Sequence, residues 1–149
     1  MPTVELRFAP LPAHVRTARL VAAALARRAG IDESFIDEVK LAVGEACARA
    51  VGIHHAHAPG DAVVVELTDD EGRFVVSVRD RGPHEAADVV ADLPDLIDLD
   101  ALVTDDPATA MPPGVGLAVV KGLVDDLTVE PLDPGTAVRM TWKPDTSPQ

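Results

Sequence analysis

The stretch SFIDEVKLAVGEACARAVGIHHAH, residues 34–57, decides the fold. Its apolar residues recur at spacings of three and four, which is the period of one face of an α-helix. This apolar stripe consists of Ile36, Val39, Val43, Ala46, Cys47 and Ala50. Ser34 followed by Asp37 is a capping-box-like start, because both side chains can accept hydrogen bonds from amides left free in the first turn. The pattern predicts one long helix, buried along this stripe.

A second face of the same helix carries the polar groups. It comprises Glu38, Leu41, Ala42, Glu45, Arg49 and Gly52, so that a carboxylate precedes an arginine by four residues. We expect the chemistry of the protein on this face. The helix ends in His54, His55 and His57, which lack spaced carboxylate or cysteine partners and are therefore interpreted as a solvated or dipole-facing cluster rather than a metal site.

The elements around this helix follow from shorter patterns. Alternating or valine-rich runs predict strands over residues 3–8, 62–68, 73–79, 128–132 and 136–142. Strong helix formers predict helices over residues 12–29 and 116–127. The four later strands form two hairpins, across turns at residues 69–72 and 133–135. Strands in one layer and helices in the other give a two-layer α/β sandwich.

Composition limits the possible partners. The 149 residues suit one domain, with 25 acidic residues, 13 basic residues and a formal charge of −12. Such a charge disfavours direct binding to nucleic acid or an anionic membrane, and suits a basic protein partner. Cys47 is the single cysteine and belongs to the apolar stripe, so a reducing compartment and a core role are expected. No leader or spanning segment is recognised, which predicts a cytoplasmic protein.

Two short motifs suggest a nucleotide site. Asp80, Arg81 and Gly82 end a predicted strand, where a carboxylate can accept a hydrogen bond from an exocyclic amine, although this pattern alone is more often a simple turn. Gly114 and Gly116 precede a predicted helix, whose free amides suit phosphate oxygens. No Gly-Lys-Ser or Gly-Lys-Thr occurs, and the dinucleotide fingerprint is incomplete, so Walker and Rossmann sites are not predicted.

The order of these pieces resembles a known family. The order is a helix with Glu45, a strand ending in Asp80, a long loop, Gly114 to Leu117, and Gly135-Thr136 opening the last strand. In this order the pieces are similar to the ATPase domain of gyrase, heat-shock chaperones, histidine kinases and mismatch-repair ATPases. Within this superfamily the chain resembles the small anti-sigma-factor serine kinases (RsbW-like), notably in LAVGEACARAV at residues 41–51.

The resemblance covers residues 3–142 and carries expectations for the whole chain. It implies a histidine-kinase-like ATPase (Bergerat) fold, with a mixed, mostly antiparallel sheet and helices packed on one face. It also implies a domain over residues 1–143 and a lid at about residues 83–113. The composition of the last residues, PDTSPQ, predicts a flexible tail at residues 144–149. ATP or ADP is the implied cofactor. Glu45 would be the general base and Asp80 would read adenine. The nucleotide would be lined by Gly82, Gly114, Val115, Gly116, Leu117 and Thr136.

Two residues depart from the family pattern. Where the family has an asparagine that holds Mg²⁺, this chain has Arg49, and arginine cannot ligate a cation because it offers only donors. No metal ligand is therefore assigned, and weak or lost phosphoryl transfer is expected. Pro83 and His84 also follow Gly82, where the family has a second glycine.

Arg49 is open to three interpretations. It could pair with Glu45 along the helix, it could bind nucleotide phosphate in place of the cation, or it could mark a pocket that has lost its nucleotide. If it binds phosphate, Arg49 itself belongs to the nucleotide site.

The resemblance implies three candidate functions. The first is an anti-sigma factor, expected as a homodimer, that sequesters a sigma factor and is released by an anti-sigma-factor antagonist. The second is an active serine kinase that phosphorylates this antagonist, with Glu45 accepting the serine proton. The third is a nucleotide sensor without transfer activity.

Overall fold

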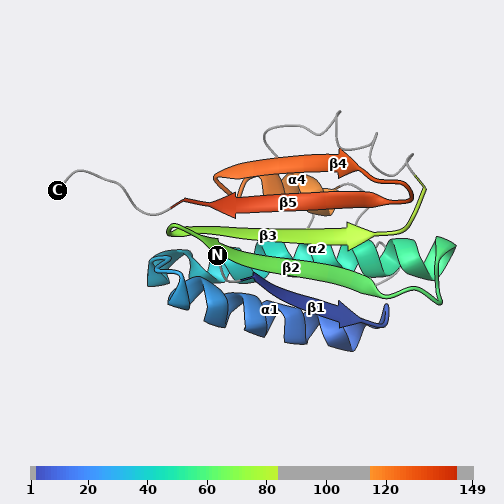
Figure 1. Cartoon of the computed structure of the whole chain (residues 1–149), viewed down its shortest axis with the longest axis horizontal. Coiled ribbons are helices and arrows are strands. Elements are labelled where there is room, and N and C mark those ends of the chain that lie inside the picture. Colours follow the sequence, from blue (N-terminus) through green and yellow to red (C-terminus); the bar gives the residue numbers. More distant parts are fainter. Residues whose placement is uncertain (1–2, 84–114, 144–149) are drawn as a thin grey trace, which may run out of the picture.

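The computed structural model describes residues 3–83 and 115–143 of the chain. Its strands are β1 (Thr3–Phe8), β2 (Val63–Asp70), β3 (Arg73–Asp80), β4 (Asp126–Pro131) and β5 (Thr136–Trp142). Its helices are α1 (Pro12–Arg28), the short 3₁₀ turn η1 (Glu33–Phe35), α2 (Ile36–His57) and α4 (Val115–Lys121). The helices lie on one face of the sheet, which confirms the predicted two-layer α/β sandwich (Figure 1).

The five strands form one sheet in the order β1-β2-β3-β5-β4. All four pairings among the described strands are antiparallel, so this part of the sheet is more uniform than the mixed sheet expected. The order matters for the site, because it places the end of β3 beside the start of β5. Asp80 stands opposite Thr136 in this register.

The two predicted hairpins are present, and the first one has a tighter turn than expected. Asp69 and Asp70 belong to β2, and the turn consists of Glu71 and Gly72, whose φ angles are 53° and 84°. A two-residue connection with positive φ at both positions has a backbone twist that matches the twist of the flanking strands. The turn predicted over residues 69–72 is therefore too long, because Asp69 and Asp70 belong to the strand.

Helix α2 supplies the centre of the core. Each residue of the predicted stripe is buried, and Cys47 is among these core side chains. Burial raises the pKa of the Cys47 thiol to about 12, which suits an inert core residue. Phe74 and Trp142 are buried across the β3–β5 pair with their ring centroids 6.1 Å apart, as expected for core aromatics.

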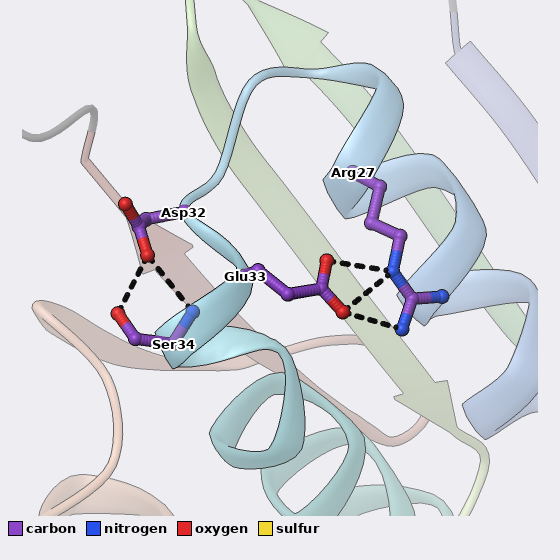
Figure 2. Close-up of polar contacts among 4 residues, drawn as sticks. All are labelled: Arg27, Asp32, Glu33 and Ser34. Atoms are coloured by element: carbon purple, nitrogen blue, oxygen red, sulfur yellow. Dashed lines mark hydrogen bonds and ion pairs between the residues drawn. The ribbon is translucent and has the colours of Figure 1, made fainter.

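The start of α2 differs from the predicted capping box. No side chain caps α2 itself, and Asp32 caps the turn η1 that leads into it. The Asp32 carboxylate accepts hydrogen bonds from the Ser34 amide at 2.8 Å and from the Ser34 hydroxyl at 2.7 Å (Figure 2). Beside it, Arg27 at the end of α1 donates to both carboxylate oxygens of Glu33. These contacts hold the short connection between the two helices, which pack against each other.

The predicted third helix is too long at its C-terminal end. Helix α4 ends at Lys121, and β4 begins at Asp126. The Asp125 amide already donates to the Thr141 carbonyl oxygen of β5, so strand pairing replaces helical hydrogen bonds in this segment. The lid beyond Pro83 and the tail at residues 144–149 lie outside the described residues. Within the described part of the chain, no helix is both long and apolar enough to span a bilayer.

Candidate functional site

Asp80 is the centre of the candidate site. It ends β3 on the face of the sheet that carries the helices, and its side chain is only 1% exposed. One carboxylate oxygen, Oδ1, accepts a hydrogen bond from the Gly82 amide at 2.9 Å. The other, Oδ2, lies 3.0 Å from Arg49 Nη1. The strand-ending motif found in the sequence therefore forms a local turn closed by its own aspartate.

Arg49 reaches Asp80 from helix α2, across 31 residues of sequence. Its side chain is 10% exposed, so the two charges form an ion pair that is largely removed from water. Removing one partner of a buried ion pair costs about 3–5 kcal/mol, because the opposite charge loses the interaction that offsets its burial. None of the three interpretations of Arg49 predicted that it pairs with Asp80.

The turn between β4 and β5 approaches Asp80 from the neighbouring strand. Gly135 has a φ of 104°, and a Cβ at this position would collide with the Asp80 carbonyl oxygen. Thr136 follows directly and is fully buried. Its hydroxyl oxygen has no hydrogen-bond partner among the described residues. A buried hydroxyl without a partner is costly, so this group beside Asp80 suits a bound ligand or water.

Sequence reasoning missed the role of His54. This side chain is fully buried: its Nδ1 lies 2.9 Å from the Asp61 carbonyl oxygen, and its Nε2 accepts from the Arg81 amide at 3.0 Å. These partners require the neutral ring with the proton on Nδ1. The solvated cluster expected here is therefore wrong for His54, although His55 and His57 are exposed. The burial of His54 was predictable from the sequence, because His54 continues the helical spacing of Val43, Cys47 and Ala50.

Gly82 lies against the same end of α2. A Cβ at Gly82 would collide with Ile53 Cγ2, so the chain can pass at this distance only with glycine. Asp61 also pairs with the Arg81 side chain, at 3.4 Å between Asp61 Oδ2 and Arg81 Nε. The end of α2 and the segment that follows it thus contact Arg81 and Gly82, next to the Asp80 carboxylate.

Glu45 precedes Arg49 by one helical turn on α2 and is half-buried. Burial raises the pKa of its carboxyl group above the ordinary value, and the positive charge of Arg19 lowers it in part. The Arg19 side chain crosses α2 beside Glu45: a Cβ at Gly44 would stand 2.8 Å from Arg19 Cδ. A raised pKa suits a general base, because it brings the pKa of the carboxyl group closer to neutral pH.

The glycine-rich segment is only partly described. Gly114 lies outside the described residues, and Val115 and Gly116 form the first positions of α4. Leu117 is fully buried in the core. The structure thus brings Arg49, Asp80, Gly82 and Thr136 together and places Glu45 one turn away. The roles assigned to these residues stay predictions.

The residues present do not fit a magnesium site of the family's kind. By the resemblance, Arg49 would stand where the family has its cation-binding asparagine; its side chain pairs with an anion, Asp80, and offers no oxygen ligand. Among residues 3–83 and 115–143, no group of three or more histidine, cysteine, aspartate or glutamate side chains is arranged to hold a metal ion.

The fold and this site define a class of protein. It is an α/β protein with an antiparallel sheet covered on one face by helices, in which a buried aspartate at a strand end pairs with an arginine of the long helix α2. In agreement, the sequence matches the histidine kinase-like ATPase domain family over residues 8–142, and the chain belongs to this family. The superfamily expected from the motif order is thereby confirmed.

A comparison of structures gives the same fold. The crystal structure of the RsbU and RsbW domains of Rv1364c from Mycobacterium tuberculosis matches with a TM-score of 0.65 and 20% sequence identity. The match covers 96% of this chain and 32% of that one, so the chain spans about a third of the length of its structural neighbour. Comparison with curated proteins gives no sequence match.

Proposed function

We propose that this protein is an anti-sigma factor with a nucleotide pocket. In this proposal it sequesters an alternative sigma factor in the cytoplasm, acts as a homodimer, and is countered by an anti-sigma-factor antagonist. The family match, the fold shared with a structure that contains an RsbW domain, and the resemblance of residues 41–51 to the RsbW-like kinases support this function. The formal charge of −12 also suits the basic DNA-binding surface of a sigma factor.

The observation that favours binding over catalysis is the ion pair between Arg49 and Asp80. Phosphoryl transfer depends mainly on positioning the nucleotide and on neutralising the charge of its phosphates. In this chain the cation-binding position carries an arginine that is paired with the proposed adenine-reading carboxylate. We therefore expect weak or absent kinase activity, with sigma binding retained.

The test of the binding function uses the purified chain and each alternative sigma factor of the same genome. Size-exclusion chromatography and calorimetry should reveal one sigma factor that forms a stable complex, and addition of the antagonist should release it. Run-off transcription should fall when the chain is added to that sigma factor with core RNA polymerase. If no sigma factor binds in either assay, the proposed function is wrong.

An active serine kinase is the second candidate, and the half-buried Glu45 favours it. Its raised pKa suits a group that accepts the serine proton of the antagonist. Incubation with ATP, Mg²⁺ and the antagonist, read by intact mass, separates the two candidates. A gain of one phosphate that Glu45→Gln abolishes supports the kinase. No gain for the wild type, with transfer restored by Arg49→Asn, supports a regulator that has lost its activity.

A further inference from the structure

We propose that the outer face of helix α1 binds the anti-sigma-factor antagonist through an acidic segment of that protein. This surface, the α1 face, consists of Arg16, Thr17, Leu20, Ala24, Arg27 and Arg28. Leu20 enters an apolar hollow of the antagonist, and arginines on either side of it pair with carboxylates of the acidic segment. The inference rests on the proposed function, because it states which of the two partners this face takes.

The six residues lie along one side of the helix. Their spacings of three and four repeat within Pro12–Arg28, and each of them is exposed. The buried residues of α1 lie on the other side, where the helix packs against α2 and β2. These buried residues are Ala18, Ala22, Ala23 and Ala26. Small side chains thus hold α1 in the fold, while the α1 face is turned away from the core.

Leu20 is the apolar centre of this face. Among the described residues it is the most exposed large apolar side chain, at 57%. A single exposed leucine is ordinary and indicates no site by itself. The surroundings of Leu20 are unusual, because the helix contains four arginines and no acidic residue, whereas the whole chain has 25 acidic and 13 basic residues. Positive charge is thus concentrated around an exposed apolar side chain, on a protein that is acidic as a whole.

Two arginines of the α1 face are available to a partner. Within residues 3–83 and 115–143, Arg16 and Arg28 take part in no ion pair, whereas Arg27 is paired with Glu33 (Figure 2). Arg16 precedes Leu20 by about one turn and Arg28 follows it by about two, so about 18 Å of helix separates the two arginines. Their planar guanidinium groups match carboxylates, and arginine is enriched in interface hot spots. The α1 face therefore fits a segment that offers carboxylates on both sides of an apolar hollow.

The charge of the face decides among the possible partners. A symmetric contact with a second copy of this chain would bring Arg16 and Arg28 against the arginines of that copy, and like charges in contact disfavour such an interface. The basic DNA-binding surface of a sigma factor would be repelled in the same way. The formal charge of −12 disfavours direct binding of nucleic acid. An acidic protein segment remains, and within the proposed function it belongs to the antagonist.

The α1 face also borders the candidate site. Arg19, one residue before Leu20, crosses α2, where a Cβ at Gly44 would stand 2.8 Å from Arg19 Cδ. Its positive charge acts on Glu45, which follows Gly44. A protein bound to the α1 face therefore lies beside the acid-bearing face of α2.

The experiment measures the affinity of the full chain for the antagonist and for the sigma factor, separately, by calorimetry. Arg16→Glu reverses one charge of the α1 face, and Leu20→Gln removes its apolar centre while keeping a good helix former. We expect each variant to bind the antagonist at least about tenfold more weakly than the wild type, and to bind the sigma factor at least as tightly. The antagonist affinity of the wild type should also fall as NaCl rises, more steeply than that of Arg16→Glu.

The matched control is Arg139→Glu, which makes the same change of charge on β5. Arg139 is exposed and stands opposite the uncharged Ser77 and Thr128. Its neighbours Val138 and Met140 belong to the core, so Arg139 lies on the sheet face away from the helices. This variant should bind both partners like the wild type. All three substitutions are at exposed positions, and circular dichroism checks that each variant stays folded.

Several results overturn the inference. One is antagonist affinity that is unchanged in Arg16→Glu or in Leu20→Gln, or that falls equally in Arg139→Glu. Another is a loss of sigma binding in the two α1 variants, which would make the α1 face a sigma site. A third is a smaller oligomer of these variants in light scattering, which would make it an interface between copies of the chain.

Failure of this inference is distinct from failure of the proposed function. If the wild type binds a sigma factor but not the antagonist, or if the α1 variants bind both partners like the wild type, the inference fails and sigma binding stands. If the wild type binds the antagonist through the α1 face but binds no sigma factor, the inference stands and the proposed anti-sigma function fails.

Discussion

Among single residues, we expect Arg49 and Asp80 to affect both the stability and the function of the protein. They form an ion pair between helix and sheet at 3.0 Å, with little access to water. An exposed pair of this kind contributes about 0–1 kcal/mol, whereas the loss of one buried partner leaves a charge in a medium that solvates it poorly. The pair therefore links the stability of the fold to the state of the proposed nucleotide site.

A double-mutant cycle measures this link. Arg49→Ala and Asp80→Ala should each lower the free energy of unfolding by about 3 kcal/mol, because each removes one partner of a buried ion pair. The double variant should cost less than the sum of the two, by about 0.5–3 kcal/mol. Urea unfolding followed by circular dichroism gives all four values. Strictly additive effects would show that the two side chains are not coupled.

Glu45 predicts a pH dependence. Burial raises the pKa of its carboxyl group in the folded protein. The folded state then keeps the proton to higher pH than the unfolded chain. The stabilising contribution of Glu45 is therefore complete below the unfolded pKa and is lost as pH rises through the folded pKa. Glu45→Gln should be more stable than the wild type at about pH 7 and lose this advantage at about pH 4.

Urea unfolding across this range checks the prediction, with Arg19→Ala as the matched variant. Arg19 lowers the pKa of Glu45, so its removal should raise that pKa and enlarge the effect. A stability difference between Glu45→Gln and the wild type that does not change with pH would contradict this account.

At the scale of the elements, the decisive contact is between the end of α2 and the end of β3. His54 joins them through its two ring nitrogens, and Gly82 passes close to Ile53. Because Asp80 adjoins Arg81, any movement of this strand end would move the carboxylate at the centre of the site. The helix therefore contributes to the site twice, through Arg49 directly and through His54 by positioning the backbone.

Substitution of His54 tests this positioning role. His54→Ala leaves the Arg81 amide without its acceptor and should destabilise the protein by about 1–3 kcal/mol. His54→Gln, whose side-chain oxygen can take the place of Nε2, should lose less. Hydrogen exchange of the Arg81 amide should accelerate in His54→Ala more than exchange in β1, which lies two strands away. Equal acceleration in both strands would indicate global destabilisation instead.

At the scale of the whole molecule, charge is the dominant feature. A formal charge of −12 on 149 residues places like charges close together on the folded surface. Self-repulsion of this kind disfavours the compact state, and salt screens it, since the Debye length falls from about 30 Å at 0.01 M to about 10 Å at 0.1 M. The same charge would attract a basic partner.

The melting temperature should therefore depend on salt. Thermal unfolding in increasing NaCl, from about 0.01 to about 0.5 M, should show a rise of a few degrees, most of it at the low end where screening changes fastest. At about pH 4, where many carboxyl groups are protonated, the rise should be smaller. A melting temperature that falls with NaCl at neutral pH would contradict the importance of self-repulsion.

The sequence by itself determined the secondary structure, the two-layer fold and the family. Helical and alternating periods are local, so the stripe from Ile36 to Ala50, β1 and the two hairpins were all predictable within a few residues. The end of α4 could not be predicted in this way, because the Asp125 amide bonds to the Thr141 carbonyl oxygen of β5, a contact that the local pattern does not show.

Only the tertiary structure decided how the site is assembled. The partner of Arg49 is 31 residues away, and His54 joins segments that no periodicity connects. The Thr136 hydroxyl became significant only when β5 paired with β3 and buried it opposite Asp80. Side-chain pairing of this kind depends on strand order and register. These long-range properties are set when the whole chain packs, so a window of sequence cannot specify them.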